Sequence, residues 1–359
     1  MPIPSELDGL TPAYLTAALR ESGVLDTSAV AAAVVDRVPA GSGFAGQSAH
    51  LRLTYDHDGD GAPVTMFAKL SASDPAVLTR LKAFGLYETE AGFYRDLSAE
   101  APLRCRGRTA LYDAESGGTL VLLEEIGHLR FGDNVAGASI DDARTALTSL
   151  ARLQAHYWNR PRLSHCDWLR TPVQDRVSLA PMLRALGPVW EQRWAATATP
   201  VATATARALM SRYEAWIDSH LAGPRTLSHG DFRPDNMAFT PEGEMVLFDW
   251  QTSRFDAPSR DVAYFLAFAL STDVRRQHEA ALLALYHQAL VDAGVRDYTL
   301  DDVRANHRRS VGSAVARMIS AGAMLDFSSE RGTKLAHAIF SRVAAMAEDH
   351  DFLAWCERL

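Results

Sequence analysis

The hydrophobic periodicity of the chain changes about a third of the way along, and this change limits the fold more than any other feature. Before residue 124, short runs alternate apolar and polar residues, which is the period of half-buried strands. Turns rich in glycine and aspartate separate these predicted strands, which are Val34–Val38, Ala49–Tyr55, Val64–Leu70, Thr109–Asp113 and Thr119–Leu123. Helices are predicted after Thr11, where Pro12 suits a first helical position, and over residues 74–97. The first part therefore reads as an antiparallel sheet with a few helices.

After residue 124 the helical period dominates. Helices are predicted over residues 141–158, 203–221, 275–293, 300–324 and 331–356. Short strand-like runs interrupt them between residues 227 and 249, and a segment rich in Pro, Trp and Arg occupies residues 159–200. We interpret that segment as an insertion facing a substrate. The pattern predicts an α+β protein with a β-rich part over residues 1–123 and a mostly helical part over residues 124–359.

Composition narrows the class of protein. The chain has 359 residues, a formal net charge of −8 and a pI near 5.8, which argues against nucleic acid as its main partner. Its three cysteines, Cys105, Cys166 and Cys356, form no CxxC pair, so neither a disulfide framework nor a cysteine zinc site is expected. The N-terminal residues lack a signal-peptide core, and the longest apolar run, Val262–Leu270, is too short to cross a bilayer. We expect a cytoplasmic protein without a membrane partner; no pattern indicates its oligomeric state.

The motif HGDFRPDN, residues 229–236, followed by VLFDWQ, residues 246–251, indicates the chemistry. Phosphoryl transfer to an alcohol needs a carboxylate near the hydroxyl proton and hard oxygen ligands for Mg²⁺. Asp231 can serve as that carboxylate, and Asn236 and Asp249 can hold metal. Taken singly, each residue could merely cap a helix or close a turn. Their order and spacing together favour a phosphotransferase.

These motifs resemble the catalytic loop and metal-binding segment of the aminoglycoside phosphotransferase-like (choline kinase-like) proteins. They are most similar to the ecdysteroid-kinase-like branch, in which a glutamine follows the metal aspartate by two, and APSRDVAYFL at residues 257–266 matches that branch as well. The resemblance implies a bilobal protein-kinase-like fold that binds ATP and Mg²⁺. It also implies that Asp261 steadies the catalytic loop and that His229 braces it through hydrogen bonds. The branch usually has Leu-His-Ala where this chain has Leu-Gln-Ala at residues 153–155.

The resemblance also assigns a nucleotide-binding half to the β-rich part. Lys69 lies inside an apolar strand, where a charge needs a partner. The resemblance implies that Lys69 contacts the α- and β-phosphates and that Glu90 is its ion-pair partner. Glu88 is the competing candidate for that pairing. From the residues alone, Lys69 could equally be a snorkelling or edge lysine.

Two backbone segments complete the expected nucleotide site. LVLLEEI, residues 120–126, resembles an inter-lobe hinge near residues 124–127, with the carbonyl of Glu124 and the amide of Ile126 facing adenine. The glycine-rich turn GSGFAGQS, residues 41–48, can cover phosphates with N–H groups, although it matches no P-loop. The residues expected to make these phosphate contacts are Gly41, Ser42 and Gly43.

We therefore predict a kinase that transfers the γ-phosphate of ATP to a hydroxyl of a small acceptor such as an aminoglycoside, a steroid or another hydroxylated metabolite. A protein kinase is disfavoured because HRD, DFG and APE segments are absent from the sequence. Two alternatives remain: a nucleotide-binding pseudokinase and a two-metal phosphoesterase. The sequence does not select ATP over GTP, the acceptor or the hydroxyl that is phosphorylated.

The acceptor surface is expected from residues 128–140, 159–200 and the helices after 300. Aromatic side chains suited to a ring-bearing acceptor, or to an ordinary core, are Trp158, Trp168, Trp190 and Trp194. Acidic side chains suited to an amine, or to a solvated helix face, are Asp326, Glu330, Glu348 and Asp351.

Overall fold

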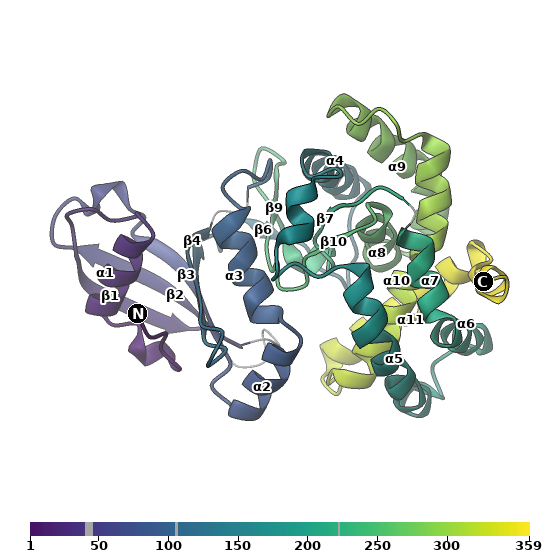
Figure 1. Cartoon of the computed structure of the whole chain (residues 1–359), viewed down its shortest axis with the longest axis horizontal. Coiled ribbons are helices and arrows are strands. Elements are labelled where there is room, and N and C mark those ends of the chain that lie inside the picture. Colours follow the sequence, from purple (N-terminus) through teal and green to yellow (C-terminus); the bar gives the residue numbers. More distant parts are fainter. Residues whose placement is uncertain (40–45, 105–106, 222) are drawn as a thin grey trace. The chain divides into compact units, whose positions relative to one another are not determined.

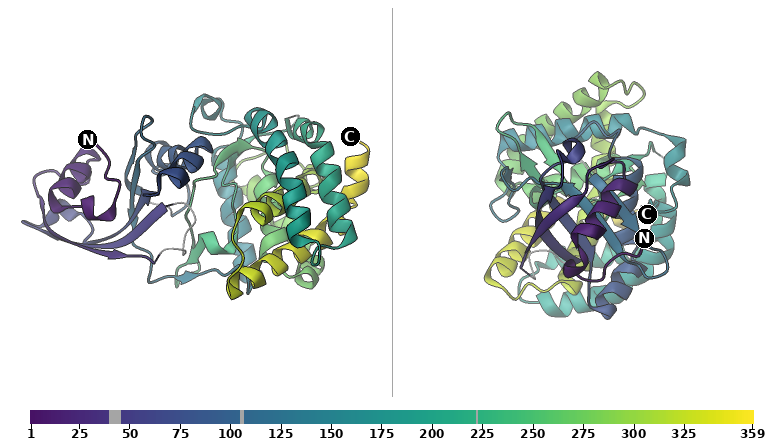
Figure 2. Two further views of the ribbon diagram at one scale, coloured as in Figure 1. Left: turned by 90° about the horizontal axis from the view of Figure 1, so that it is seen from below. Right: turned by 90° about the vertical axis from the view of Figure 1, so that its left-hand side faces the viewer.

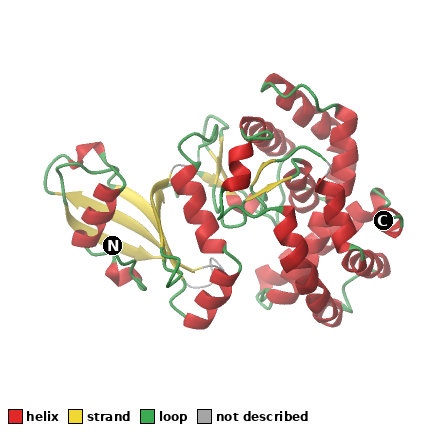
Figure 3. Ribbon diagram, viewed as in Figure 1, coloured by secondary structure: helices red, strands yellow, loops and turns green. Residues whose placement is uncertain are grey.

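The computed structural model describes residues 1–39, 46–104, 107–221 and 223–359. The chain divides into two compact units. The first unit comprises Met1–Leu129 and Val246–Ser253, and the second comprises Arg130–Met245 and Arg254–Leu359. The strands of the larger sheet belong to the first unit, and helices dominate the second, as the colouring in Figure 3 shows. The predicted α+β class is confirmed; the predicted boundary after residue 123 remains a prediction.

A five-stranded antiparallel sheet forms the centre of the first unit, with the strand order β1-β2-β3-β5-β4 (Figure 1). The strands are β1 (Val30–Arg37), β2 (Gly46–Tyr55), β3 (Thr65–Ser71), β4 (Gly107–Tyr112) and β5 (Thr119–Glu124). Each overlaps a strand predicted from the alternating pattern. Short connections between neighbouring strands are typical of antiparallel pairing.

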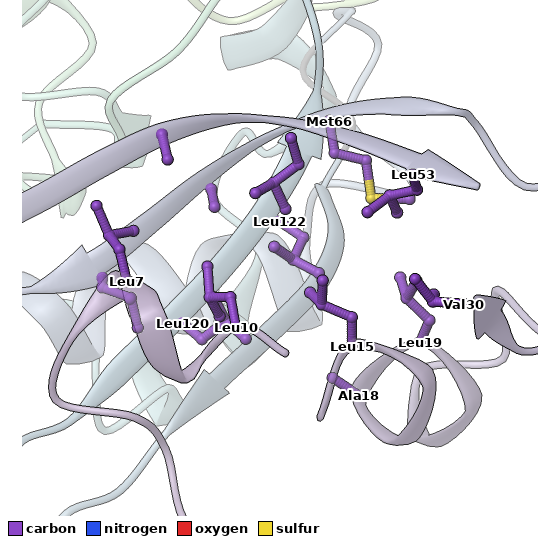
Figure 4. Packing of buried hydrophobic residues seen from close by; sticks show 14 of the residues in the cluster. Leu7, Leu10, Leu15, Ala18, Leu19, Val30, Leu53, Met66, Leu120 and Leu122 are labelled. Atoms are coloured by element: carbon purple, nitrogen blue, oxygen red, sulfur yellow. The ribbon is translucent and has the colours of Figure 1, made fainter. Parts of the chain in front are cut away.

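The alternation along β3 separates a core face from a functional face. Met66, Ala68 and Leu70 are buried in a cluster with leucines of helix α1 (Pro12–Glu21), as Figure 4 shows for Met66. Because successive side chains of a strand point to opposite faces, Lys69 points away from that cluster. Burial of the apolar set thus determines which side of the sheet receives the charge.

The predicted helix over residues 74–97 is instead two helices, α2 (Pro75–Ala83) and α3 (Leu86–Asp96). Gly85 separates them and adopts the left-handed conformation, with φ of +68°. A residue in that conformation ends the helical hydrogen-bond ladder, and glycine adopts it without the steric cost of a Cβ. The new axis lets α3 pack against β4 and β5.

The second unit is built from helices with a few short strands; Figure 2 shows these helices in teal to yellow. Its helices are α4 (Ile140–His156), α5 (Pro172–Trp194), α6 (Pro200–Ser211), α7 (Tyr213–Leu221), α8 (Ser259–Ala269), α9 (Thr272–Asp292), α10 (Leu300–Met324), α11 (Glu330–Asp349) and α12 (Phe352–Glu357). Its strands are β6 (Arg130–Phe131), β7 (Thr226–Ser228), β8 (Met237–Phe239) and β10 (Arg254–Asp256). Every residue of α8 is buried, and α10 contacts α5, α8 and α11. Strand β9 (Met245–Leu247) carries the chain from this unit into the segment Val246–Ser253.

Two of the predicted helices in this unit are also divided. The stretch 203–221 forms α6 and α7, and the stretch 331–356 forms α11 and α12. Between α11 and α12, Asp351 has a φ of +47°. Asp is among the few non-glycine residues that tolerate the left-handed conformation. The apolar periodicity continues on both sides of Asp351, so the sequence pattern does not show that the helix axis changes there.

The segment 159–200 contains the long helix α5, which the sequence analysis did not predict. Pro181 and Pro188 lie inside this helix, and because proline usually breaks a helix, the sequence pattern does not indicate one here. Trp190 is fully buried, and the indole Nε1 of Trp194 donates to the carbonyl of Gly322 at 2.9 Å. These two tryptophans are core residues of the second unit and do not form an aromatic acceptor surface.

Among the described residues, no helix combines the length and the apolar character needed to cross a membrane.

Candidate functional site

The turn after β7 carries the first half of the predicted site. Buried strand β7 leads into His229, Gly230 and Asp231. The carboxylate of Asp261, in the first turn of α8, accepts the N–H of His229 at 2.7 Å and the N–H of Gly230 at 2.9 Å. Gly230 has a φ of +79°, which glycine adopts readily. The loop therefore has a defined shape that depends on Asp261.

Four polar side chains surround the carboxylate of Asp231. The Tyr264 hydroxyl donates to Oδ1 at 2.6 Å, and Arg233 Nε and Asn236 Nδ2 donate to Oδ2 at 3.1 and 3.0 Å. The guanidinium of Arg317, on α10, lies 3.9 Å from Oδ1. Only 14% of the Asp231 side chain is exposed. These contacts hold the carboxylate in one orientation.

The same contacts set the protonation state of Asp231. Burial alone would raise its pKa, but Arg233, Arg317 and the Tyr264 hydroxyl together hold the pKa well below the ordinary value. Asp231 is consequently ionised at neutral pH. A carboxylate of such low basicity can accept a hydrogen bond from a substrate hydroxyl and orient it, but it takes the proton only as the transfer proceeds.

His229 contributes through its ring as well as its backbone. The ring is buried, and its Nδ1 accepts the N–H of Asp231 at 3.3 Å. A ring nitrogen used in this way stabilises the loop. This geometry agrees with the bracing role implied by the resemblance.

Asn236 ends the short turn Pro234–Asn236. Its Nδ2 donates to the carbonyl oxygen of Asp231 at 2.9 Å in addition to the carboxylate. Because the amide nitrogen is engaged with the loop, the amide oxygen is the atom available to a hard cation. Asp235 anchors the same turn, since its carboxylate accepts Arg233 Nη1 at 2.9 Å and the N–H of Asn134 at 2.8 Å.

The second half of the predicted site lies in the first unit and centres on Lys69. The ammonium Nζ is 2.5 Å from Glu90 Oε1, on α3, and 3.1 Å from Asp249 Oδ1. The expected ion pair with Glu90 is present; Glu88, the competing candidate, lies on the same helix. Burial would lower the pKa of Lys69, but Asp249 and Glu90 outweigh it and raise the pKa, so the ammonium stays charged.

Asp249 occupies an unusual backbone conformation, with φ of +68°. Its Oδ2 accepts Gln251 Nε2 at 3.1 Å. The next residue, Trp250, is fully buried and stacks on Phe93 with ring centroids 3.6 Å apart. Phe93 lies one turn after Glu90 on α3, so one helix positions both the lysine partner and the segment that carries Asp249. Left-handed non-glycine residues are often found at functional sites.

The remaining nucleotide-site predictions concern backbone segments. Glu124 ends β5, and its side chain forms an ion pair with Arg104 at 2.7 Å. The carbonyl of Ile126 accepts the N–H of Leu129 at 2.9 Å. Neither contact tests the predicted contacts of Glu124 and Ile126 with adenine. The predicted phosphate-covering residues Gly41, Ser42 and Gly43 lie outside the described residues.

The structure thus gathers the predicted side chains into two sets. One set, in the first unit, contains Lys69, Glu90 and Asp249; the other, in the second unit, contains His229, Asp231, Asn236 and Asp261. The oxygen donors of Asp249 and Asn236 are the ligand type that Mg²⁺ prefers, and Lys69 is suited to phosphate oxygens. Each set by itself therefore offers groups of the kinds that bind a nucleotide or its metal ion.

Three residues of the Asp231 environment were not predicted from the sequence. Tyr264 follows Asp261 by three positions on α8, so helical spacing could have placed both on the same face. Arg233 lies inside the motif itself. Arg317 comes from α10, far along the chain, and no local pattern indicates its approach.

A small cavity of about 200 Å³ lies beside the turn that carries Asn236. Pro234 lines it, together with Arg130, Asp133 and Gly137 from the predicted acceptor segment 128–140. The acidic residues considered for an amine acceptor include Glu330 and Asp351, which form ion pairs with Lys334 and Arg308 on exposed surface. These two fit the solvated-surface interpretation.

Comparison with known proteins agrees with this fold. The ecdysteroid kinase-like family model matches residues 171–296. A candidate aminoglycoside phosphotransferase from Ralstonia eutropha superposes with a TM-score of 0.51 at 17% identity, over 95% of this chain and 98% of that one. Choline kinase from Cryptosporidium parvum superposes with a TM-score of 0.57 at 9% identity, over 88% and 89%. An amicoumacin kinase in complex with AMP-PNP and Ca²⁺ gives 0.51 at 12% identity, over 86% and 87%.

Curated relatives match only short segments. Acyl-CoA dehydrogenase family member 10 of Mus musculus is 46% identical over 59 residues, which is 15% of this chain and 6% of that protein. A second relative matches over 23% of its length. The structural matches establish the kinase-like fold, and together with the family match they confirm the resemblance predicted from the sequence.

Proposed function

We propose that this chain, with the fold of the aminoglycoside phosphotransferase-like and choline kinases and its match to the ecdysteroid kinase-like family, is an ATP- and Mg²⁺-dependent kinase of a small hydroxylated molecule. The observation that carries the proposal is the Asp231 carboxylate, buried and kept ionised by Arg233, Arg317 and Tyr264. Four side chains orient this carboxylate: Arg233, Arg317, Tyr264 and the candidate metal ligand Asn236.

The nucleotide half of the mechanism rests on Lys69. In the proposed complex its ammonium contacts phosphate oxygens, while Glu90 fixes the direction of the side chain. The second carboxylate partner, Asp249, is then available to hold metal through its oxygens. Its left-handed backbone and the stacked Trp250 keep it in place for that role.

The acceptor half rests on Asp231. Its carboxylate accepts a hydrogen bond from the acceptor hydroxyl and aligns the oxygen for attack. It receives the hydroxyl proton as the bond from that oxygen to the γ-phosphorus forms and the bond from the γ-phosphorus to the oxygen of the departing ADP breaks. Asn236 would hold metal through its amide oxygen. Magnesium held there would supply positive charge that neutralises the transferring phosphate. His229 and Asp261 hold the loop in shape through the contacts described above.

The acceptor is proposed as a small hydroxylated molecule because the related kinases include those named for choline and for the antibiotic amicoumacin. We place the protein in the cytoplasm, a location that suits the buried thiol of Cys356. A protein that only binds a nucleotide does not need a carboxylate oriented as Asp231 is, so the contacts of Asp231 favour a catalytic role over a non-catalytic one. A two-metal phosphoesterase would need several acidic and histidine ligands converging near Asp231, where basic and hydroxyl side chains are found instead.

The proposal is tested by a coupled assay of ADP release with ATP and Mg²⁺ against a panel of aminoglycosides, sugars, steroids, hydroxy acids and choline. Acceptor-dependent ADP release that disappears in Asp231→Ala supports it and identifies the acceptor class. Tight nucleotide binding without turnover across a broadened panel would favour a pseudokinase. Release of phosphate from phosphoesters without ATP would favour a phosphoesterase.

A further inference from the structure

A second cluster of chemically active side chains lies in the helical unit, apart from the Asp231 loop. Glu279 comes from α9, His307 from α10, and His350 directly follows α11. One ligand atom of each lies within 4.8 Å of the others. All three helices contact one another. Three segments distant in sequence therefore bring one carboxylate and two imidazoles to one point.

The distances match a metal site before metal binds. His350 Nε2 is 2.7 Å from Glu279 Oε1, and His307 Nε2 is 3.5 Å from the same oxygen. In a tetrahedral zinc site with bonds near 2.0–2.2 Å, neighbouring ligand atoms lie about 3.3 Å apart. Movements of less than about 1 Å at side-chain tips would bring these atoms to that spacing.

The imidazole nitrogens provide a second, independent observation. His307 is fully buried, yet neither of its ring nitrogens has a hydrogen-bond partner among the described residues. The Nε2 of His350 likewise forms no hydrogen bond among the described residues, although it lies 2.7 Å from Glu279 Oε1. Buried polar atoms without partners are uncommon in folded proteins. The nitrogens converge beside the carboxylate oxygen, as they would around a shared ion.

Surrounding groups orient these candidate ligands. Arg275 Nη1 donates to Glu279 Oε2 at 2.5 Å, which leaves Oε1 directed at the histidines. Asp349, next to His350, accepts hydrogen bonds from Arg275 and Arg276. The carbonyl of His350 accepts Arg308 Nε at 2.8 Å. Such outer contacts commonly hold metal ligands in position.

We propose that Glu279, His307 and His350 form a binding site for a divalent transition metal ion of the zinc type, which joins α9, α10 and the end of α11. Two imidazoles and one carboxylate are the ligand set of many zinc sites that have a water in the fourth position. Imidazole nitrogen is a poor ligand for Mg²⁺, which prefers oxygen ligands. Glu279 and His350 are 13% and 19% exposed, so the cluster lies near the surface of the helical unit. The competing arrangement is a metal-free cluster in which the two histidines interact directly with Glu279.

The test uses tag-free full-length protein that has been stripped with chelator and kept in excess Mg²⁺. Co²⁺ is titrated while visible absorption is recorded, and Zn²⁺ retention is measured by elemental analysis after dialysis. We expect one Co²⁺ per chain with the bands of a four- or five-coordinate site, displacement by Zn²⁺, and a higher Tm with stoichiometric Zn²⁺. None of these measurements depends on kinase activity.

Variants decide which residues bind the ion. His350→Ala removes a partly exposed ligand and should weaken Co²⁺ binding at least about 100-fold and abolish the Zn²⁺ effect on Tm. Glu279→Gln tests the carboxylate in the same way. The matched control His337→Ala replaces an exposed histidine of α11 and should bind as the parent does. Absence of bound Co²⁺ in the parent protein, or equal binding by the parent and His350→Ala, would overturn the proposal in favour of the metal-free cluster.

Discussion

At Asp231, the local sequence and the tertiary structure act on one carboxylate. Arg233 and Asn236 come from the same motif, whereas Tyr264 and Arg317 arrive from α8 and α10. The motif was readable in the sequence because its parts lie within eight residues. The spacing from Asp261 on α8 could have indicated Tyr264, whereas the approach of Arg317 depends on helix packing, which no local pattern encodes.

The proposed role of Asp231 predicts a large loss of turnover without a loss of folding. Asp231→Asn keeps the hydrogen-bonded shape but removes the charge that receives the hydroxyl proton. We expect kcat to fall at least about 1000-fold, equivalent to about 4 kcal/mol of barrier. Steady-state kinetics measures the rate, and circular dichroism checks the fold. A rate within tenfold of the parent enzyme would remove Asp231 from the proposed role.

The Tyr264 hydroxyl should help to orient the Asp231 carboxylate, and turnover should continue at a lower rate without it. Tyr264→Phe deletes the hydroxyl that donates to Oδ1 at 2.6 Å. A hydrogen bond to a charged group is worth about 1.5–3 kcal/mol, so kcat should fall about 10- to 100-fold. The control is Tyr213→Phe, whose hydroxyl is buried in the same unit without a hydrogen-bond partner among the described residues. Equal rates for both variants would show that the Tyr264 contact is not used.

The low pKa of Asp231 predicts the acidic side of the pH profile. Burial raises that pKa, but the two arginines and Tyr264 lower it by more than burial raises it. The carboxylate therefore stays ionised until the pH falls below the ordinary aspartate pKa of about 3.9. We expect no loss of kcat/KM from this group above about pH 5. Arg233→Met should move the acidic limb to higher pH. An acidic limb that Arg233→Met leaves in place would assign it to another group.

At the scale of elements, the sequence predicted best where one period runs unbroken. All five strands of the larger sheet were located, because burial of one face imposes alternation. Gly85 divided a predicted helix, since a left-handed residue interrupts the ladder without interrupting the apolar pattern. Helix α5 was missed because Pro181 and Pro188 break the pattern, although the helix continues through both.

A buried ion network connects α5 to strand β10. Asp175 is fully buried, and its Oδ2 is 2.5 Å from Arg254 Nη2. Asp175→Ala leaves that guanidinium buried without this partner, so we expect the free energy of unfolding to drop by about 3–5 kcal/mol in urea denaturation. The control is Asp218→Ala, which breaks the half-exposed pair between α5 and α7 and should cost less than about 1 kcal/mol. Similar losses for both variants would show that burial does not strengthen the Asp175 contact.

At the scale of the whole molecule, each unit holds a complete set of contacts of its own. Lys69, Glu90 and Asp249 are arranged within the first unit, although Asp249 lies far along the chain. Asp231, Asn236 and Asp261 are arranged within the second. The motifs indicated Asp231, Asn236 and Asp249, and the resemblance added Lys69, Glu90 and Asp261. No pattern indicated that the segment Val246–Ser253 belongs to the first unit.

Nucleotide binding should depend on the first unit's lysine. Lys69→Met retains the apolar stem in the strand and removes the charge, so we expect ATP affinity to fall at least about tenfold in titration calorimetry with Mg²⁺ present. The control is Lys82→Met, on α2, whose ammonium donates to the carbonyl of Glu115 at the surface. Undiminished ATP binding by Lys69→Met would separate this lysine from the nucleotide site.

The most direct test of the proposed kinase activity follows the γ-phosphate itself. Parent protein and Asp231→Asn are incubated with ATP, Mg²⁺ and the acceptor selected by the ADP-release panel. The phosphorus that leaves the γ-position of ATP is then followed by ³¹P NMR and chromatography. If the protein is a kinase, the γ-phosphate appears on an acceptor hydroxyl with the parent protein and does not with the variant. A γ-phosphate released only as inorganic phosphate, or transferred equally by both proteins, would contradict the proposed kinase activity.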